Sequence, residues 1–223
     1  MLRTIVENLH KIKDTLPDNV HLVAVSKTKP ISNLQEAYDA GQRIFGENKI
    51  QELREKEQLL PKDIEWHMIG HMQSNKVKYI APYISLIHGV ESLKLLQEIN
   101  KQALKNKRTI NILLQFHIAT ESTKFGFQLE EAKEILDSDD FKRLENIEVC
   151  GVMGMASFVN KESQVRQEFA NLKSIFEYLK SNYFPSAEAF NTVSMGMSGD
   201  YQIAIEEGST MIRIGSSIFG ARN

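Results

Sequence analysis

Residues 21–41 read HLVAVSKTKPISNLQEAYDAG. The first six are apolar enough for a buried strand, and the last ten carry apolar residues at helical spacing. We expect Ser32 or Asn33 to cap this helix, with Glu36 at the capping-box position and Gly41 ending it. A polar turn that contains Lys27 separates the two elements. The stretch is one strand followed by one helix, which is the repeating unit of α/β folds.

The same unit recurs along the chain. The predicted strands are HLVAVS, RIFG, EWHMIG, ISLIHGV, INILLQFHI, IEVCGVMGM, AEAFNTV and TMIRIG. Helical patterns lie between them, and an amphipathic helix opens the chain and ends near Pro17. Strict alternation of eight strands with helices predicts a single α/β domain over residues 1–223, a (β/α)8 TIM barrel with an extra N-terminal helix. A doubly wound open sheet is the alternative, because RIFG and ISLIHGV are weak strands.

Composition narrows the function classes. The 223 residues are 42% hydrophobic and 25% charged, which is typical of a globular protein, and the net charge of -2 argues against nucleic-acid or anionic-membrane partners. The single cysteine, Cys150, cannot form an internal disulfide and is expected in the core. No signal peptide or membrane-spanning run is apparent, so we expect a cytoplasmic protein. No Cys/His cluster is present and no metal site is expected, and the charge run ELREKEQ (52–58) is expected to be a solvated helix face.

Lys27 follows the first strand, and barrels place their chemistry at the carboxyl ends of strands. A lysine amine shielded from water is a nucleophile toward aldehydes, although a solvated loop lysine is the simpler interpretation. After the last two strands come NTVSMGMSGD (191–200) and IRIGSSIFG (212–220), both rich in small residues. Their candidate phosphate-binding residues are Ser194, Gly196, Ser198, Gly215, Ser216 and Ser217. Tight turns and helix caps would explain the same composition.

Arg213 lies between Ile212 and Ile214, so strand alternation directs its side chain into the barrel interior. A structural ion pair with a carboxylate is the alternative to a ligand contact. The first and eighth strands are neighbours in a closed barrel, so Lys27 and Arg213 would share one rim with the phosphate-binding turns. Pyridoxal 5′-phosphate (PLP) has the matching aldehyde and phosphate. A phosphorylated aldose would also match, which leaves a Schiff-base aldolase open.

Five segments in chain order resemble signature segments of the pyridoxal phosphate homeostasis protein family, which is of the alanine-racemase N-terminal-domain type. They are AVSKTKP, IFGENKIQE, WHMIGHMQSNK, SMGMSGD and RIGSSIFG. STKFGF (122–127) and GVMGMA (151–156) are also similar, with Val152 in place of the usual leucine. The resemblance implies a barrel that binds PLP covalently on Lys27 as an internal aldimine, with Arg213 approaching the ring nitrogen.

The resemblance also implies further cofactor-binding residues. Those carried over by position are Asn48, His67, Ser194, Met195, Gly215 and Ser216. Ser194, Gly215 and Ser216 match phosphate contacts, and Met195 would contribute its backbone N–H. Asn48 and His67 would line the pocket, although a hydrogen-bonded interior histidine would explain His67 equally simply.

A PLP site need not be an enzyme site. A permanently charged arginine beside the ring nitrogen disfavours the protonated ring that stores electrons in catalysis. A racemase also needs an acid or base on the opposite face of the cofactor, and we expect no second domain to supply it, because the chain stops at Asn223. We therefore expect a PLP homeostasis protein without catalytic residues, which buffers PLP or supplies it to PLP-dependent apo-enzymes as a monomer or weak dimer. The alternative is a PLP-dependent amino-acid racemase.

Overall fold

The computed structural model describes residues 4–120 and 125–220, which leaves part of the STKFGF motif (122–124) and the chain end at Asn223 outside the described residues. Eight parallel strands pair in chain order, and the last pairs with the first to close a barrel. The strands are β1 (His21–Val25), β2 (Ile44–Glu47), β3 (Glu65–Met68), β4 (Leu86–Val90), β5 (Ile110–Phe116), β6 (Ile147–Gly154), β7 (Thr192–Met197) and β8 (Met211–Ile214). The predicted barrel is confirmed, and the open-sheet alternative is wrong because β8 pairs with β1.

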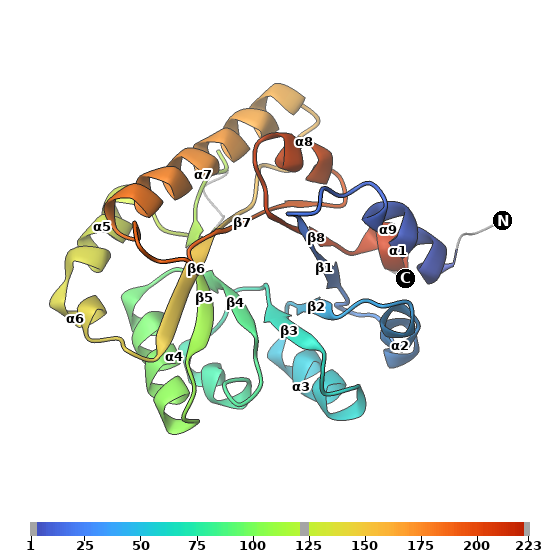
Figure 1. The fold of residues 1–223 in the computed structure, drawn as a ribbon, viewed down its shortest axis with the longest axis horizontal. Helices are drawn as coiled ribbons and strands as arrows, with labels where there is room; N and C mark the ends of the chain where they lie inside the picture. Colours follow the sequence, from blue (N-terminus) through green and yellow to red (C-terminus); the bar gives the residue numbers. More distant parts are fainter. Residues whose placement is uncertain (1–3, 121–124, 221–223) are drawn as a thin grey trace.

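Helices surround the strands (Figure 1). They are α1 (Ile5–Lys13), α2 (Ile31–Asp39), α3 (Ile50–Leu59), α4 (Leu93–Lys105), α5 (Leu129–Asp137), α6 (Asp139–Lys142), α7 (Glu162–Asn182), α8 (Tyr201–Glu206) and α9 (Ser216–Phe219), with a 3-10 helix η1 (Ser74–Tyr79) after β3. The predicted extra N-terminal helix is α1, which packs against α2 and α9. Thr4 begins it with a capping box to Glu7. No helix of the described residues is long and apolar enough to span a bilayer.

The core has two layers. The larger lies between the strands and the helices, and the smaller fills the barrel interior. The buried apolar residues of the interior are Val23, Leu86, Leu113, Met153 and Met211. Polar side chains occupy positions two residues further along several of these strands, among them His88, Gln115 and Arg213. The interior therefore changes from apolar to polar toward the carboxyl ends of the strands.

The seventh strand differs from its prediction. AEAFNTV (187–193) was expected to form it, but β7 spans Thr192–Met197. The apolar residues before it form a turn, because the Phe190 ring stacks on Phe184 at 4.4 Å and on Phe176 at 5.1 Å between ring centroids. Ser194 and Met195 consequently lie within the strand and not in the loop that follows it.

Two smaller expectations concern α2 and Cys150. The predicted cap of α2 is wrong: the helix begins at Ile31, and Pro30 occupies the N-cap position without a side-chain hydrogen bond. Gly41 follows the C-cap of α2, as predicted for the end of this helix, and its φ of 88° favours glycine. Cys150 is half-buried beside the interior cluster, and burial raises the pKa of its thiol to about 11.

Candidate functional site

Lys27 and the turn after β8 both lie at the carboxyl end of the barrel. Lys27 lies in the turn after β1, separated from the strand by Ser26, and is half-buried. The pairing of β1 with β8 sets Val23 opposite Arg213. Gly215 follows β8, and a Cβ atom added to it would lie 3.2 Å from the carbonyl oxygen of Val25. The turn that begins α9 thus packs against the end of the strand that leads into Lys27.

The turns after β7 and β8 are joined by a hydrogen bond. The Gly215 N–H donates to the Ser198 hydroxyl oxygen at 3.3 Å. Gly196, predicted in the first of these turns, lies within β7; it has a φ of 96°, and a Cβ there would lie 2.6 Å from the Cβ of Ala204, so glycine is required. Ser216 is exposed in the first turn of α9, where backbone N–H groups have no partner within the helix. The structure therefore brings the two predicted turns together at one rim.

Arg213 points into the barrel and is 4% exposed, as strand alternation predicted. Its Nη1 donates to the Ser194 hydroxyl oxygen at 2.6 Å, and its Nη2 donates to the Gly154 carbonyl at 3.1 Å. Burial lowers the pKa of Arg213 to about 10, so the side chain remains a cation at neutral pH. Within residues 4–120 and 125–220 it forms no ion pair, although the Asp200 carboxylate acts on it at longer range.

Ser194 has a different position from the one predicted. Its place in the loop after the seventh strand is wrong, because it lies inside β7 with its hydroxyl between Arg213 and His88. Its contact with a phosphate stays a prediction. Met195 is also within β7, and its side chain packs in the outer core, so any ligand contact must come from its backbone.

A chain of hydrogen bonds continues from Ser194 across the barrel interior. His88 Nδ1 lies 3.0 Å from Ser194 Oγ, and His88 Nε2 lies 3.0 Å from His67 Nδ1. Burial lowers the pKa of His67 to about 3 and the pKa of His88 well below its ordinary value. Both rings are therefore neutral near pH 7. His67 takes the hydrogen-bonded interior position, and His88 is a site residue that the sequence reasoning missed, although it stands at an inward position in LIHGV.

Asn48 follows β2 at the same end of the barrel. Its Oδ1 atom is buried and has no hydrogen-bond partner among the described residues. Gly70, after β3, packs on the Asn48 backbone so closely that a Cβ would lie 2.6 Å from the Asn48 carbonyl oxygen. A buried acceptor without a donor costs free energy, so Asn48 Oδ1 suits a hydrogen-bond donor of a ligand.

A buried ion-pair network behind Lys27 was also missed. Lys56 of α3 is 5% exposed and forms an ion pair with Glu47 of β2 at 2.7 Å. The expectation that ELREKEQ is a solvated face is wrong for Lys56, because this position of α3 faces β2. The i,i+4 contact of Lys56 with Glu52 is present at 3.4 Å.

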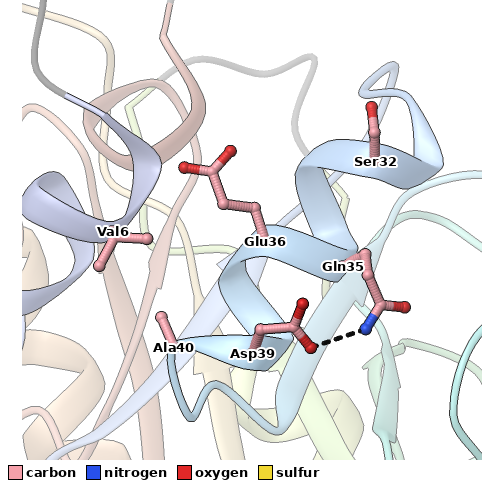
Figure 2. A pocket seen from close by; sticks show the side chains of 6 residues that line it. All are labelled: Val6, Ser32, Gln35, Glu36, Asp39 and Ala40. Atoms are coloured by element: carbon pink, nitrogen blue, oxygen red, sulfur yellow. Dashed lines mark hydrogen bonds between the residues drawn. The ribbon is translucent and has the colours of Figure 1, made fainter.

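Two hollows lie away from this rim. One, of about 530 Å³, lies between α1 and α2 and is drawn in Figure 2. Its carboxylates are those of Glu36 and Asp39, and Gln35 donates to Asp39 at 2.8 Å, so it does not suit a phosphate. The other, of about 370 Å³, includes His21 and Glu65 at the amino ends of β1 and β3. No cluster of His, Cys, Asp or Glu in the described part of the chain could hold a metal ion.

Comparisons with known proteins place the chain. The family model for the alanine racemase N-terminal domain matches residues 1–223. The pyridoxal phosphate homeostasis protein of Aquifex aeolicus is 38% identical over 202 residues, which cover 90% of this chain and 86% of that protein. The protein of the same name from Escherichia coli K12 is 35% identical, with 100% of this chain and 98% of that protein covered.

Solved structures agree with this placement. PipY of Synechococcus elongatus with PLP bound has a TM-score of 0.88 and 32% identity, and covers 97% of this chain and 100% of PipY. An alanine racemase of Clostridium difficile has a TM-score of 0.80, but its 16% identity supports the fold alone, and the chain covers 60% of it. By sequence and by fold, the chain belongs to the pyridoxal phosphate homeostasis protein family.

Proposed function

We propose that this protein binds PLP at the carboxyl end of the barrel and holds it for delivery to PLP-dependent apo-enzymes, without turning over a substrate. The observation that carries the proposal is the pairing of β1 with β8, which packs a glycine–serine turn against the end of the strand that leads into the half-buried Lys27. Family membership supports it, because the relatives are named for PLP homeostasis and PipY has been solved with PLP bound.

Each part of the proposed site has a chemical task. Lys27 would hold PLP at its aldehyde carbon through the side-chain amine, with the aldehyde oxygen lost as water. Gly215 and Ser216 hold the phosphate with backbone N–H and hydroxyl groups, with Ser194 and the Met195 backbone as further candidates. Asn48 Oδ1 is a buried acceptor suited to the ring hydroxyl. Bound PLP supplies a reactive carbonyl and an electron-accepting ring.

Arg213 favours storage over catalysis in this proposal. Its hydrogen-bond partners are the Ser194 hydroxyl and the Gly154 carbonyl, both neutral. A guanidinium beside the pyridine nitrogen opposes protonation of that nitrogen, and an unprotonated ring is a weaker electron sink. His67 lines the interior as a neutral ring. A cytoplasmic location, one barrel domain over residues 1–223, and a monomer or weak dimer belong to the same proposal.

An absorbance spectrum of the purified protein with added PLP tests this function. We expect a visible band from the Lys27 adduct, which disappears in Lys27→Ala. Lys29→Ala is the matched control, because Lys29 lies in the same turn, with its amine 3.1 Å from the Gly220 carbonyl, and this variant should keep the band. An absorbance spectrum of the protein that shows no new band on addition of PLP would refute binding. Rapid racemisation in a panel of amino acids would refute storage and favour the racemase alternative.

A further inference from the structure

The peptide groups on both sides of Lys27 are held by side chains of α3. The Ser26 carbonyl oxygen accepts a hydrogen bond from Lys56 Nζ at 2.8 Å. The Thr28 N–H donates to Glu52 Oε2 at 2.7 Å. The backbone just before and just after Lys27 is therefore fixed by one helix, which packs on the outer side of β2.

Lys56 joins these contacts into a single network. Its ammonium donates to the Ser26 carbonyl, to Glu47 Oε1 at 2.7 Å and to Glu52 Oε2 at 3.4 Å, which uses all three of its donors. The Ser26 hydroxyl donates to the same Glu47 oxygen at 2.6 Å. Glu47 is fully buried, and burial raises its pKa while Lys56 and Ser26 oppose that rise. We call Glu47, Lys56 and Glu52 the triad.

The turn that the triad holds is strained. Thr28 has a φ of 63°, in the left-handed region that a β-branched residue rarely adopts. Such a conformation persists only where its surroundings determine it, and it is commonly found at functional sites. The Glu52 carboxylate stabilises this conformation, because it accepts a hydrogen bond from the Thr28 N–H.

We infer that the triad positions Lys27 so that its amine meets the PLP aldehyde at the mouth of the barrel. This inference rests on the proposed function and adds three positioning residues to it. Ser26 continues the pairing of β1 with β2 and is bonded on the helix side, so extending the alternation by one residue directs Lys27 toward the interior side, which Val23 and Arg213 also face. Without the Glu52 acceptor, Thr28 relaxes toward negative φ and the Lys27 side chain changes direction.

The test separates positioning from binding and from folding. Glu52→Leu removes the acceptor, Glu52→Gln keeps an acceptor oxygen, and Glu55→Leu removes an exposed carboxylate from the same helix as the control. For each variant we would measure the rate at which the Lys27 adduct band appears with PLP. The affinity for pyridoxine 5′-phosphate, which has no aldehyde, reports the rest of the site, and thermal unfolding reports the fold.

A displacement of about 1 Å can reduce the rate of a positioned reaction on the order of 100-fold. We expect Glu52→Leu to slow adduct formation roughly 10- to 100-fold, with the affinity for pyridoxine 5′-phosphate unchanged. Glu52→Gln should recover most of the rate, and Glu55→Leu should match the wild type. If Glu52→Leu does not fold, Glu52→Ala takes its place with the same expected loss of rate.

Two results would overturn the inference. One is a wild-type rate of adduct formation in Glu52→Leu. The other is an equal loss of adduct rate and of pyridoxine 5′-phosphate affinity, which would mean that the triad only supports the fold. Failure of the proposed function is distinguishable from both, because the wild-type protein would then form no band with PLP.

Discussion

The two buried histidines should make the protein sensitive to mild acid, and His88→Gln should remove half of that sensitivity. Burial lowers the pKa of His67 to about 3 and holds the pKa of His88 well below its ordinary value. In the unfolded chain both titrate near pH 6.5. The unfolded state therefore binds more protons than the folded state below that pH. The contribution of the two histidines to the free energy of unfolding is largest above about pH 6.5 and decreases as pH falls toward the folded pKa values.

The size of the effect follows from linkage. A histidine that stays neutral in the folded state and titrates near 6.5 when unfolded reduces the free energy of unfolding by about 1.4 kcal/mol between pH 7.5 and pH 5.5. His67 and His88 together should contribute about 2.7 kcal/mol over this range. Burial raises the pKa of the Glu47 and Glu91 carboxyls, which contribute with the opposite sign. That contribution is common to the wild type and the variant and cancels in their difference.

Urea unfolding of the cofactor-free protein at about pH 7.5 and about pH 5.5 measures this change in the free energy of unfolding. His88→Gln is less stable at pH 7.5, because it disrupts the hydrogen bonds to Ser194 and His67. Its further loss on moving to pH 5.5 should be about 1.4 kcal/mol smaller than that of the wild type. His10→Gln, an exposed substitution on α1, is the control and should behave as the wild type does. Equal losses in the wild type and His88→Gln would refute neutral burial of His88.

Two further substitutions test the geometry of the barrel. Ser194→Ala removes the hydroxyl that accepts the 2.6 Å hydrogen bond from Arg213 Nη1. This substitution should lower the free energy of unfolding by about 2–3 kcal/mol and the melting temperature by roughly 5–10 °C. An unchanged melting temperature would contradict this expectation. Gly151→Ala should yield no soluble protein on expression, because Gly151 has a φ of 149° and a Cβ there would lie 1.9 Å from the Thr192 carbonyl oxygen. A folded Gly151→Ala protein would show that β6 and β7 can separate at this point.

The barrel was predictable from the sequence because its signals are local. Apolar strands and amphipathic helices alternate with distinct periods, and each unit resembles the stretch at residues 21–41. Strand alternation also predicted that Arg213 points inward between two outward isoleucines. Lys27 could be located for the same reason, since it stands where an apolar run stops.

The misplaced seventh strand has a physical cause. Ser194 and Gly196 are small residues of the kind that form turns, so their segment resembles a loop. In the folded chain the small Ser194 side chain leaves room beside β8 for the Arg213 guanidinium, to which its hydroxyl is bonded. The strand-like apolar residues before it belong instead to the turn that carries the Phe190 stack. Neither the Arg213–Ser194 hydrogen bond nor the Phe190 stack can be predicted from the residues adjacent in sequence.

The burial of Lys56 could not be predicted for a similar reason. Its neighbours in ELREKEQ are mostly charged, and the helix has polar residues over much of its surface. Lys56 is buried because Glu47, at the end of β2, and the Ser26 carbonyl, at the end of β1, both face it. A lysine that closes a network between two strands and a helix is recognisable only when the strand ends have been placed.

Among the residues that the structure describes, the barrel buries two cations, Lys56 and Arg213, in different ways. Lys56 has carboxylate partners on both sides, so its charge is compensated locally and its contribution is geometric. Arg213 is bonded to a hydroxyl and a carbonyl, and no ion pair of Arg213 occurs in the described parts of the chain. Its charge therefore acts on the barrel interior. Under the proposed function, Lys56 would fix where the Lys27 amine stands, and Arg213 would set the electrostatic potential that bound PLP experiences.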